Sequence, residues 1–224
     1  TSSATNITIQ GNVIGRDGVN LADHGNSRDG ITITGGGNNT IGGVSPAAAN
    51  VIAGNGRNGV KITAGGNGWA NLVLGNSIFG NNKLEDGLGI DLDYDQEGVD
   101  PADNSTPGPD PNTAYANYGQ NAPVVGSGLS APHYDPITGN LVVDWTLDTA
   151  PSTPVTIQFF TNDAAGFSGN GEGRTFIGFI AVVTDGAGHA QGLVPVTPPS
   201  PLDSRGLYLT MTAAATNPVA DLPG

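Results

Sequence analysis

The chain has 224 residues and no cysteine, and its 7 Lys and Arg against 20 Asp and Glu give a net charge of −13. This balance excludes a nucleic-acid-binding surface, which needs a basic footprint, and disfavours an anionic membrane. The lack of cysteine excludes disulfides and thiolate metal sites, and no apolar run is long enough for membrane insertion. Cations are the small partners that this charge favours.

The N-terminal part of the chain is repetitive. Gly30, Gly59 and Gly89 each begin a Gly-apolar-x-apolar segment, a repeat of about 30 residues that is typical of a solenoid. Each segment places apolar side chains on one face of a short strand, and the intervening Asn and Gly allow sharp turns. One unit cannot bury its apolar face alone, whereas stacked units share a core. We therefore predict a parallel β-solenoid of about three coils over residues 1–95.

Two further features of the solenoid follow from its sequence. The asparagines that open the coils, such as Asn12, Asn50 and Asn76, are expected to stack as side-chain amide ladders inside the turns. The first strand, at residues 7–9, is preceded by no capping helix, although terminal repeats normally need a polar cap. We expect an open end there, covered either by a removed cap or by another chain.

Residues 96–122 are rich in proline and carboxylates, which excludes a helix or a central strand and predicts a linker or an ion-bound loop. In the preceding strand Ile90 and Leu92 should point inward, so that Asp91 and Asp93 share the outer face beside this loop. A hard cation with oxygen ligands would relieve the repulsion among so many carboxylates. We predict a Ca²⁺ site here, with a solvated acidic linker as the alternative. The candidate ligands are Asp91, Asp93, Asp95, Glu97, Asp100, Asp103 and Asp110.

From Pro123 onward the apolar residues alternate in strand-like segments, at a spacing typical of an antiparallel sandwich. The predicted strands lie at 124–125, 141–147, 155–160, 174–184, 190–196 and 207–215. We predict a β-sandwich domain over residues 123–224, joined to the solenoid by the acidic junction at 96–122.

Several motifs resemble those of a known group of proteins. Residues 39–43, 50–56 and 87–92 resemble the right-handed parallel β-helix repeats of large bacterial and archaeal secreted surface proteins. Residues 120–125 and 171–178 resemble the immunoglobulin-like module that follows such repeats. The resemblance implies a right-handed helix, an immunoglobulin-like sandwich and a location outside the cell. In such modules a further short strand follows the one at 207–215, so we expect its absence to leave an apolar groove.

The function expected from these features is a non-enzymatic, extracellular structural or adhesive module. Exposed strand edges favour association unless they are covered, and strand addition from a neighbouring chain covers them. We therefore expect self-association into a surface filament or sheath, stiffened by Ca²⁺, or contact with neighbouring domains of a longer chain. A surface polysaccharide is a further candidate partner.

The alternative is a polysaccharide lyase or glycoside hydrolase, or its carbohydrate-binding portion. Asp91 and Asp93 could form a carboxylate pair, with Arg57 and Lys61 on the neighbouring coil. The solenoid is short and carries few aromatic residues for binding sugars, and no catalytic residue is assigned. The aromatic candidates are Trp69, Phe79 and Tyr94, and the three histidines, His24, His133 and His189, are expected at turn or surface positions.

Overall fold

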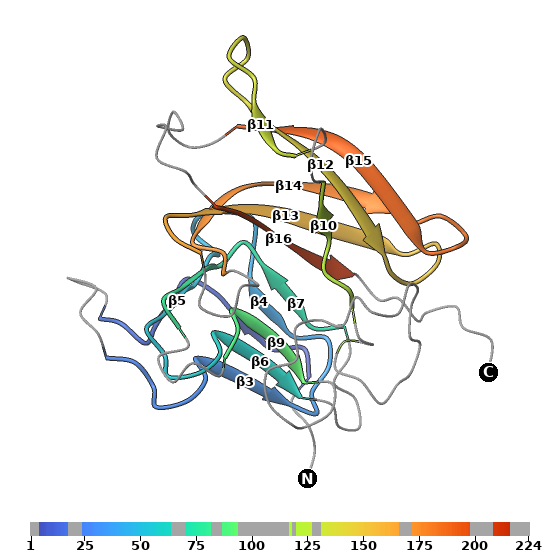
Figure 1. Cartoon of the computed structure of the whole chain (residues 1–224). Helices are drawn as coiled ribbons and strands as arrows, with labels where there is room; N and C mark the ends of the chain where they lie inside the picture. The colour runs from blue at the N-terminus through green and yellow to red at the C-terminus, as the bar shows by residue number, and fades with distance from the viewer. Residues whose placement is uncertain are drawn as a thin grey trace.

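The computed structural model describes residues 5–17, 24–63, 70–81, 87–93, 117, 120–126, 131–165, 172–197 and 208–215. Over these residues the chain is all-β: a stack of short parallel strands, then two antiparallel sheets that lie on one end of the stack (Figure 1). Among the same residues there is no helix with the length and apolar character needed to cross a membrane.

The N-terminal strands form three parallel sheets, ordered β1-β4-β7, β2-β5-β8 and β3-β6-β9. Their bounds are β1 (Thr8–Ile9), β2 (Val13–Ile14), β3 (Ile31–Thr34), β4 (Thr40–Gly42), β5 (Val51–Ala53), β6 (Val60–Thr63), β7 (Leu72–Leu74), β8 (Ser77–Phe79) and β9 (Ile90–Asp93). We call β1–β3 the first coil, β4–β6 the second and β7–β9 the third. The prediction of a parallel β-solenoid with about three coils is confirmed.

The register stacks apolar residues in columns inside the solenoid. Ile41 lies between Ile9 and Val73, and Ile62 lies between Ile33 and Leu92. Ile41 and Ile62 in the second coil have no exposed surface, because a coil covers each of them on both sides. As predicted, Ile90 and Leu92 pack against this core.

The predicted asparagine ladders are also present. Asn50 donates from its backbone N and its Nδ2 to Asn76 Oδ1, at 3.0 and 2.9 Å, and its own Oδ1 accepts from Asn12. Similar bonds join Asn39 to Asn71 and Asn55 to Asn81. In the second and third coils these amides are buried, and each satisfies backbone and side-chain groups of the preceding coil, so the ladders hold the turns in register.

The remaining strands form a sandwich. They are β10 (Val124–Val125), β11 (His133–Tyr134), β12 (Leu141–Asp148), β13 (Pro154–Asn162), β14 (Thr175–Val183), β15 (His189–Val196) and β16 (Tyr208–Ala215). One sheet has β12 at its centre, paired with β10, β11 and β15, and the other has the order β14-β13-β16. All six predicted strands are present. The additional strand β11 was not predicted, because it has two residues, both exposed, and no apolar alternation.

The alternation of buried apolar and less buried residues along β12 accounts for the core of the sandwich. Leu141, Val143, Trp145 and Leu147 are all buried, and they face Val155, Ile157 and Phe159 of β13 across the two sheets. Unlike β12, strand β13 is buried on both faces, because its sheet lies between the other sheet and the solenoid (Figure 1). Side chains from the second face of β13 therefore reach the solenoid.

An exposed pair in the sandwich, His189 and Asp148, predicts a testable dependence of stability on pH. His189 Nδ1 lies 2.8 Å from Asp148 Oδ1, and this hydrogen bond, aided by the negative charge of Asp148, raises the pKa of His189 above 6.5. Because the folded pKa is raised, the stabilisation from this pair is complete below pH 6.5 and is lost as the pH rises through the folded pKa. In an NMR titration we expect Asp148→Asn to lower the His189 pKa toward 6.5. An unchanged pKa in that variant would contradict the assignment.

Candidate functional site at the junction of solenoid and sandwich

The third coil of the solenoid ends against the sandwich, and Gln158 of β13 makes the most buried contact. Its Oε1 accepts from the backbone N of Gly75 at 2.5 Å, and its Nε2 donates to the carbonyl of Val73 at 3.0 Å. A residue in a further parallel strand would pair with the same carbonyl and amide, two positions apart. The side-chain amide of Gln158 therefore stands in for one residue of a fourth strand next to β7.

Asn117 closes one of the asparagine ladders in a comparable way. Its Oδ1 accepts from the backbone N of Asn71 at 3.0 Å, as Asn71 Oδ1 accepts from Asn39 one coil earlier. Its Nδ2 donates to the carbonyl of Asn71 at 2.8 Å. One coil earlier, the backbone N of Leu72 donates to the carbonyl of Asn39 in the same way. Asn117 thus reproduces both hydrogen-bonding groups that a further coil would provide.

Glu172 closes a second ladder with a carboxylate. Its Oε1 accepts from the backbone N and the Nδ2 of Asn81, at 3.1 and 3.0 Å, and its Oε2 accepts from the backbone N of Gly80 at 2.6 Å. Next to it the carbonyl of Gly173 accepts from the backbone N of Ile78 at 2.8 Å. We call Asn117, Gln158 and Glu172 the side-chain cap, because together they bond to the outer side of the last coil at and beside β7 and β8, as another coil would.

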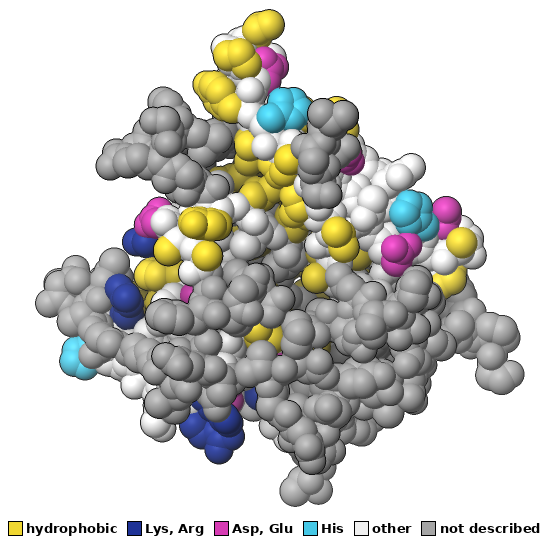
Figure 2. Space-filling model, viewed as in Figure 1, with side chains coloured by type: hydrophobic (Ala, Val, Ile, Leu, Met, Phe, Trp, Pro, Cys, Tyr) yellow, Lys and Arg dark blue, Asp and Glu magenta, His cyan; other side chains and the backbone are white. Residues whose placement is uncertain are grey.

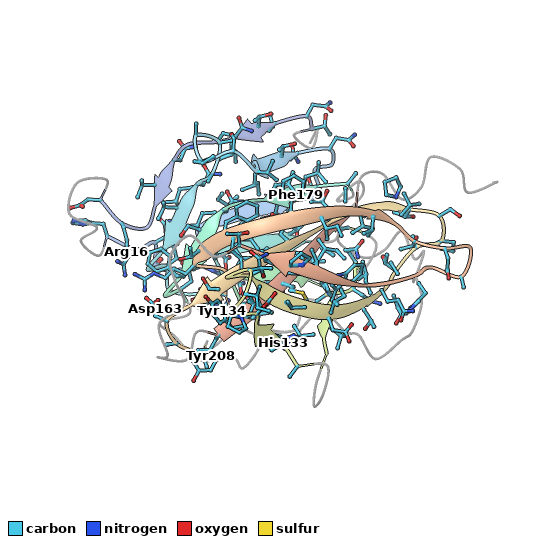
Figure 3. The ribbon with its side chains drawn as sticks, turned by 90° about the horizontal axis from the view of Figure 1, so that it is seen from above. Arg16, His133, Tyr134, Asp163, Phe179 and Tyr208 are labelled. Carbon is cyan, nitrogen blue, oxygen red and sulfur yellow. The ribbon has the colours of Figure 1, made fainter. Side chains whose placement is uncertain are left out.

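Aromatic and charged groups line the rim of this contact. The guanidinium carbons of Arg16 and Arg174 lie 5.1 and 4.7 Å from the centroid of the Phe79 ring, and Arg174 also forms an ion pair with Asp163. Seen from above, Arg16 of the solenoid and Asp163 of the sandwich lie at the same end of the molecule (Figure 3). The contact of Arg174 with Phe79 crosses the junction and adds to the attachment of the sandwich, whereas Arg16 and Phe79 both belong to the solenoid.

A groove of about 520 Å³ lies where the two parts meet. Its lining includes Tyr208 and Met211 of β16, Val125 of β10, and Ile90 and Leu92 of β9. Within the described residues β16 pairs with β13 alone, so its other edge is open beside this groove. The apolar groove expected beside residues 207–215 is therefore present. Apolar side chains also gather over the sandwich in the space-filling view (Figure 2).

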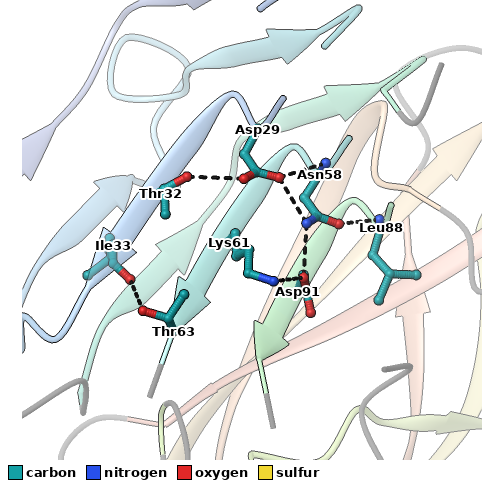
Figure 4. Close-up of polar contacts among 8 residues, drawn as sticks. All are labelled: Asp29, Thr32, Ile33, Asn58, Lys61, Thr63, Leu88 and Asp91. Carbon is teal, nitrogen blue, oxygen red and sulfur yellow. Dashed lines mark hydrogen bonds and ion pairs between the residues drawn. The ribbon is translucent and has the colours of Figure 1, made fainter. Parts of the chain in front are cut away.

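The structure describes the surroundings of only part of the acidic set that was predicted to bind Ca²⁺ at the end of the solenoid. Asp91 lies on the face of β9 opposite the core residues Ile90 and Leu92, as predicted, and it is buried there, with 1% of its surface exposed. Its Oδ2 accepts from Asn58 Nδ2 at 2.9 Å and from Lys61 Nζ at 3.2 Å, and Asn58 in turn contacts Asp29 in the first coil (Figure 4). Within the stack, Lys61 balances the charge of Asp91, and Asn58 donates a hydrogen bond to the same carboxylate oxygen.

The structure does not place the rest of the predicted Ca²⁺ ligands. Asp93 is the last residue of β9, and nothing is described of its side chain. The other candidates, Asp95, Glu97, Asp100, Asp103 and Asp110, lie outside the described residues. Within the described part of the chain, no three His, Asp or Glu side chains are arranged to hold a metal ion. The calcium site therefore stays a prediction.

A substitution separates a structural role of Asp91 from a role in metal binding. Asp91→Asn removes the charge opposite Lys61, which is 20% exposed, and is expected to lower the free energy of unfolding by about 2–4 kcal/mol. Urea denaturation should give the same loss with Ca²⁺ and with EGTA. Asp29→Asn is the matched control, because Asp29 is only partly buried and an amide oxygen can still accept from Asn58. A loss that appears only with Ca²⁺ would contradict the structural role.

The chain was compared with known proteins. It matches no protein-family model, and no curated protein matches it. The function is therefore argued from the junction itself.

Sequence reasoning did not identify the side-chain cap. Gln158 occurs in a strand whose neighbours Ile157, Phe159 and Phe160 are apolar, and a lone polar residue in such a run was the available signal. Glu172 and Asn117 lie in segments with no periodicity, so no local pattern marks them. The aromatic residue Phe79 was named as a candidate for sugar binding, but its ring is covered by guanidinium groups and does not line the groove.

Proposed function

We propose that the chain is a non-enzymatic structural or adhesive module of an extracellular surface protein, with a right-handed solenoid and an immunoglobulin-like sandwich. The observation that carries this proposal is the side-chain cap. Gln158 and Glu172 form hydrogen bonds with residues of the last coil that are 83 and 92 positions away in the sequence. These bonds support a single stiff unit rather than two domains joined by a flexible linker.

The chemistry of the junction supports a structural role over a hydrolytic one. Among the described residues, Glu172 is the one carboxylate that lines the groove, and both of its oxygens accept hydrogen bonds from the solenoid. Glycoside hydrolysis needs two carboxylates beside the sugar. Lys61 and Asp91, the neighbours considered for a lyase, are engaged with each other inside the stack.

The test compares turnover with assembly. We expect no release of reducing ends or unsaturated products from a panel of plant, algal and bacterial polysaccharides, measured over a day at micromolar protein. Cleavage of any of them that is lost in Glu172→Gln would overturn the proposal in favour of an enzyme. Binding of a polysaccharide without cleavage would agree with an adhesive role.

Self-association and calcium belong to the same proposal. The open edge of β16 beside the groove is a site for strand addition from a neighbouring chain, and Ca²⁺ on the acidic segment would stiffen the product. Light scattering is expected to detect large particles that become smaller on addition of EGTA, with an earlier thermal melt. A monomer that is indifferent to EGTA would contradict both parts.

A further inference from the structure

The opposite end of the solenoid differs from the capped end. Ile41 and Ile52 of the second coil have no exposed surface, whereas their partners in the first coil, Ile9 and Ile14, are only partly buried. The apolar core therefore continues to the outer edges of β1, β2 and β3, which we call the N-terminal face.

The hydrogen bonds of the ladders give this face a direction. In two of the ladders each asparagine donates from its N and Nδ2 to the Oδ1 of the following coil, as Asn12 does to Asn50 and Asn26 does to Asn55. Within the described residues no group donates to the Oδ1 of Asn12 or Asn26, and both residues are exposed. The N-terminal face thus presents hydrogen-bond acceptors at the positions where a preceding coil would supply donors.

We propose that the N-terminal face is a docking surface for the last coil of another parallel β-solenoid, stacked in the same direction. Such a coil would extend the three sheets at β1, β2 and β3, bury the apolar edge, and donate from two asparagines to Asn12 and Asn26. This inference rests on the proposed structural function and names the class of partner.

A second copy of this chain fits the face poorly in either orientation. Two copies placed face to face would bring the acceptor oxygens of Asn12 and Asn26 against one another, because the ladder bonds run in one direction. Head-to-tail stacking would need a bare last coil, but Gln158 and Glu172 occupy that position. The partner is therefore a solenoid whose last coil is uncapped.

The second coil of this chain provides a probe with the required pattern. A synthetic peptide of residues 38–63 carries Asn50 and Asn55 at the positions that should donate to Asn12 and Asn26. The same segment can be fused in frame ahead of residue 3, which leaves the same spacing before β1 as between β3 and β4 and removes the entropic cost of association. With either probe, amide hydrogen exchange in residues 7–14 and 31–34 of the full chain is expected to slow by about tenfold or more. Exchange in β16 should not change.

Single substitutions in the probe test the direction of the ladders. Asn50→Asp or Asn55→Asp replaces a donor with a carboxylate facing an acceptor, and each should remove most of the protection. Asn39→Asp is the matched control, because Asn39 would face Ile7, which offers no side-chain acceptor. In the full chain, Ile7→Asn adds the missing acceptor at a position that is 46% exposed, and it should tighten binding several-fold.

The outcomes separate this proposal from its alternatives. Protection by neither the peptide nor the fused coil would overturn it, as would equal losses for all three substituted probes. Protection of the first coil that grows with the concentration of the chain alone would also overturn it, in favour of a second copy. None of these results depends on polysaccharide turnover or on EGTA, so a failure here is distinct from a failure of the proposed function.

Discussion

Gln158→Leu is expected to lower the free energy of unfolding by about 3–5 kcal/mol, because it leaves two buried backbone groups without partners. The amide of Gly75 and the carbonyl of Val73 would each lose a hydrogen bond, and Gln158 itself has no exposed surface. The hydrogen bond that Gln158 Nε2 donates to the hydroxyl oxygen of Thr212, at 3.0 Å, would be lost as well. Leucine is of similar volume, so the loss would come from unsatisfied polar groups rather than from a cavity.

The measurement is urea denaturation followed by two probes. In a Trp69→Phe background, fluorescence of Trp145, which is buried in the sandwich core, reports on the sandwich, and far-UV circular dichroism reports on the whole chain. We expect coincident transitions in the wild type and an earlier loss of the solenoid in the variant. Gln191→Leu is the matched control, since Gln191 is exposed on β15, and it should change stability by less than about 0.5 kcal/mol. Similar losses in the two variants would contradict the capping role.

Asn55→Asp is expected to destabilise the solenoid by about 3–5 kcal/mol at neutral pH, because it places an unpaired carboxylate in the buried ladder. Asn55 accepts from Asn26 and donates through Nδ2 to Asn81 Oδ1 at 2.9 Å. The substitution keeps the acceptor but turns the donor into an oxygen that faces the oxygen of Asn81. Asn55 has no exposed surface, so water cannot relieve the repulsion.

The pH dependence of this variant provides a second readout. Burial raises the pKa of the introduced carboxyl above that of the unfolded chain, so the folded variant binds the extra proton first as the pH falls. The protonated form can donate to Asn81, and the deficit relative to the wild type should shrink between about pH 6 and pH 4. Urea titrations at several pH values check this. Asn6→Asp, at an exposed position in the first coil, is the control and should show little change. A deficit that is constant with pH would contradict the proposed cause.

The solenoid could be predicted because the sequence pattern that specifies it is local and is repeated in each coil. Segments such as those at Gly59 and Gly89 place apolar residues at alternate positions, and a period of about 30 residues implies stacking. The ladder asparagines could be anticipated for the same reason, since Asn50 and Asn76 precede equivalent strands of successive coils. The sandwich strands likewise follow from alternation, whereas β11 carries too few residues to show any.

The junction could not be predicted to the same depth. Asp91 stands at an outward position in β9, and alternation alone suggests exposure. Its burial depends on Lys61 and Asn58, which reach it from the adjacent coil. Register between coils, rather than the local sequence, decides which charges meet.

The sequence by itself determined most of the strand content, the parallel stacking, the ladders and the net charge of −13. Tertiary structure alone decided how the last coil of the solenoid is closed. The cap by Gln158 and Glu172 joins residues more than 80 positions apart, and such contacts leave no periodic trace in the chain. The strand pattern repeats because every coil must bury its apolar face and turn in the same way. The end of the stack occurs once, and the polar side chains that satisfy it come from parts of the chain that only the fold brings there.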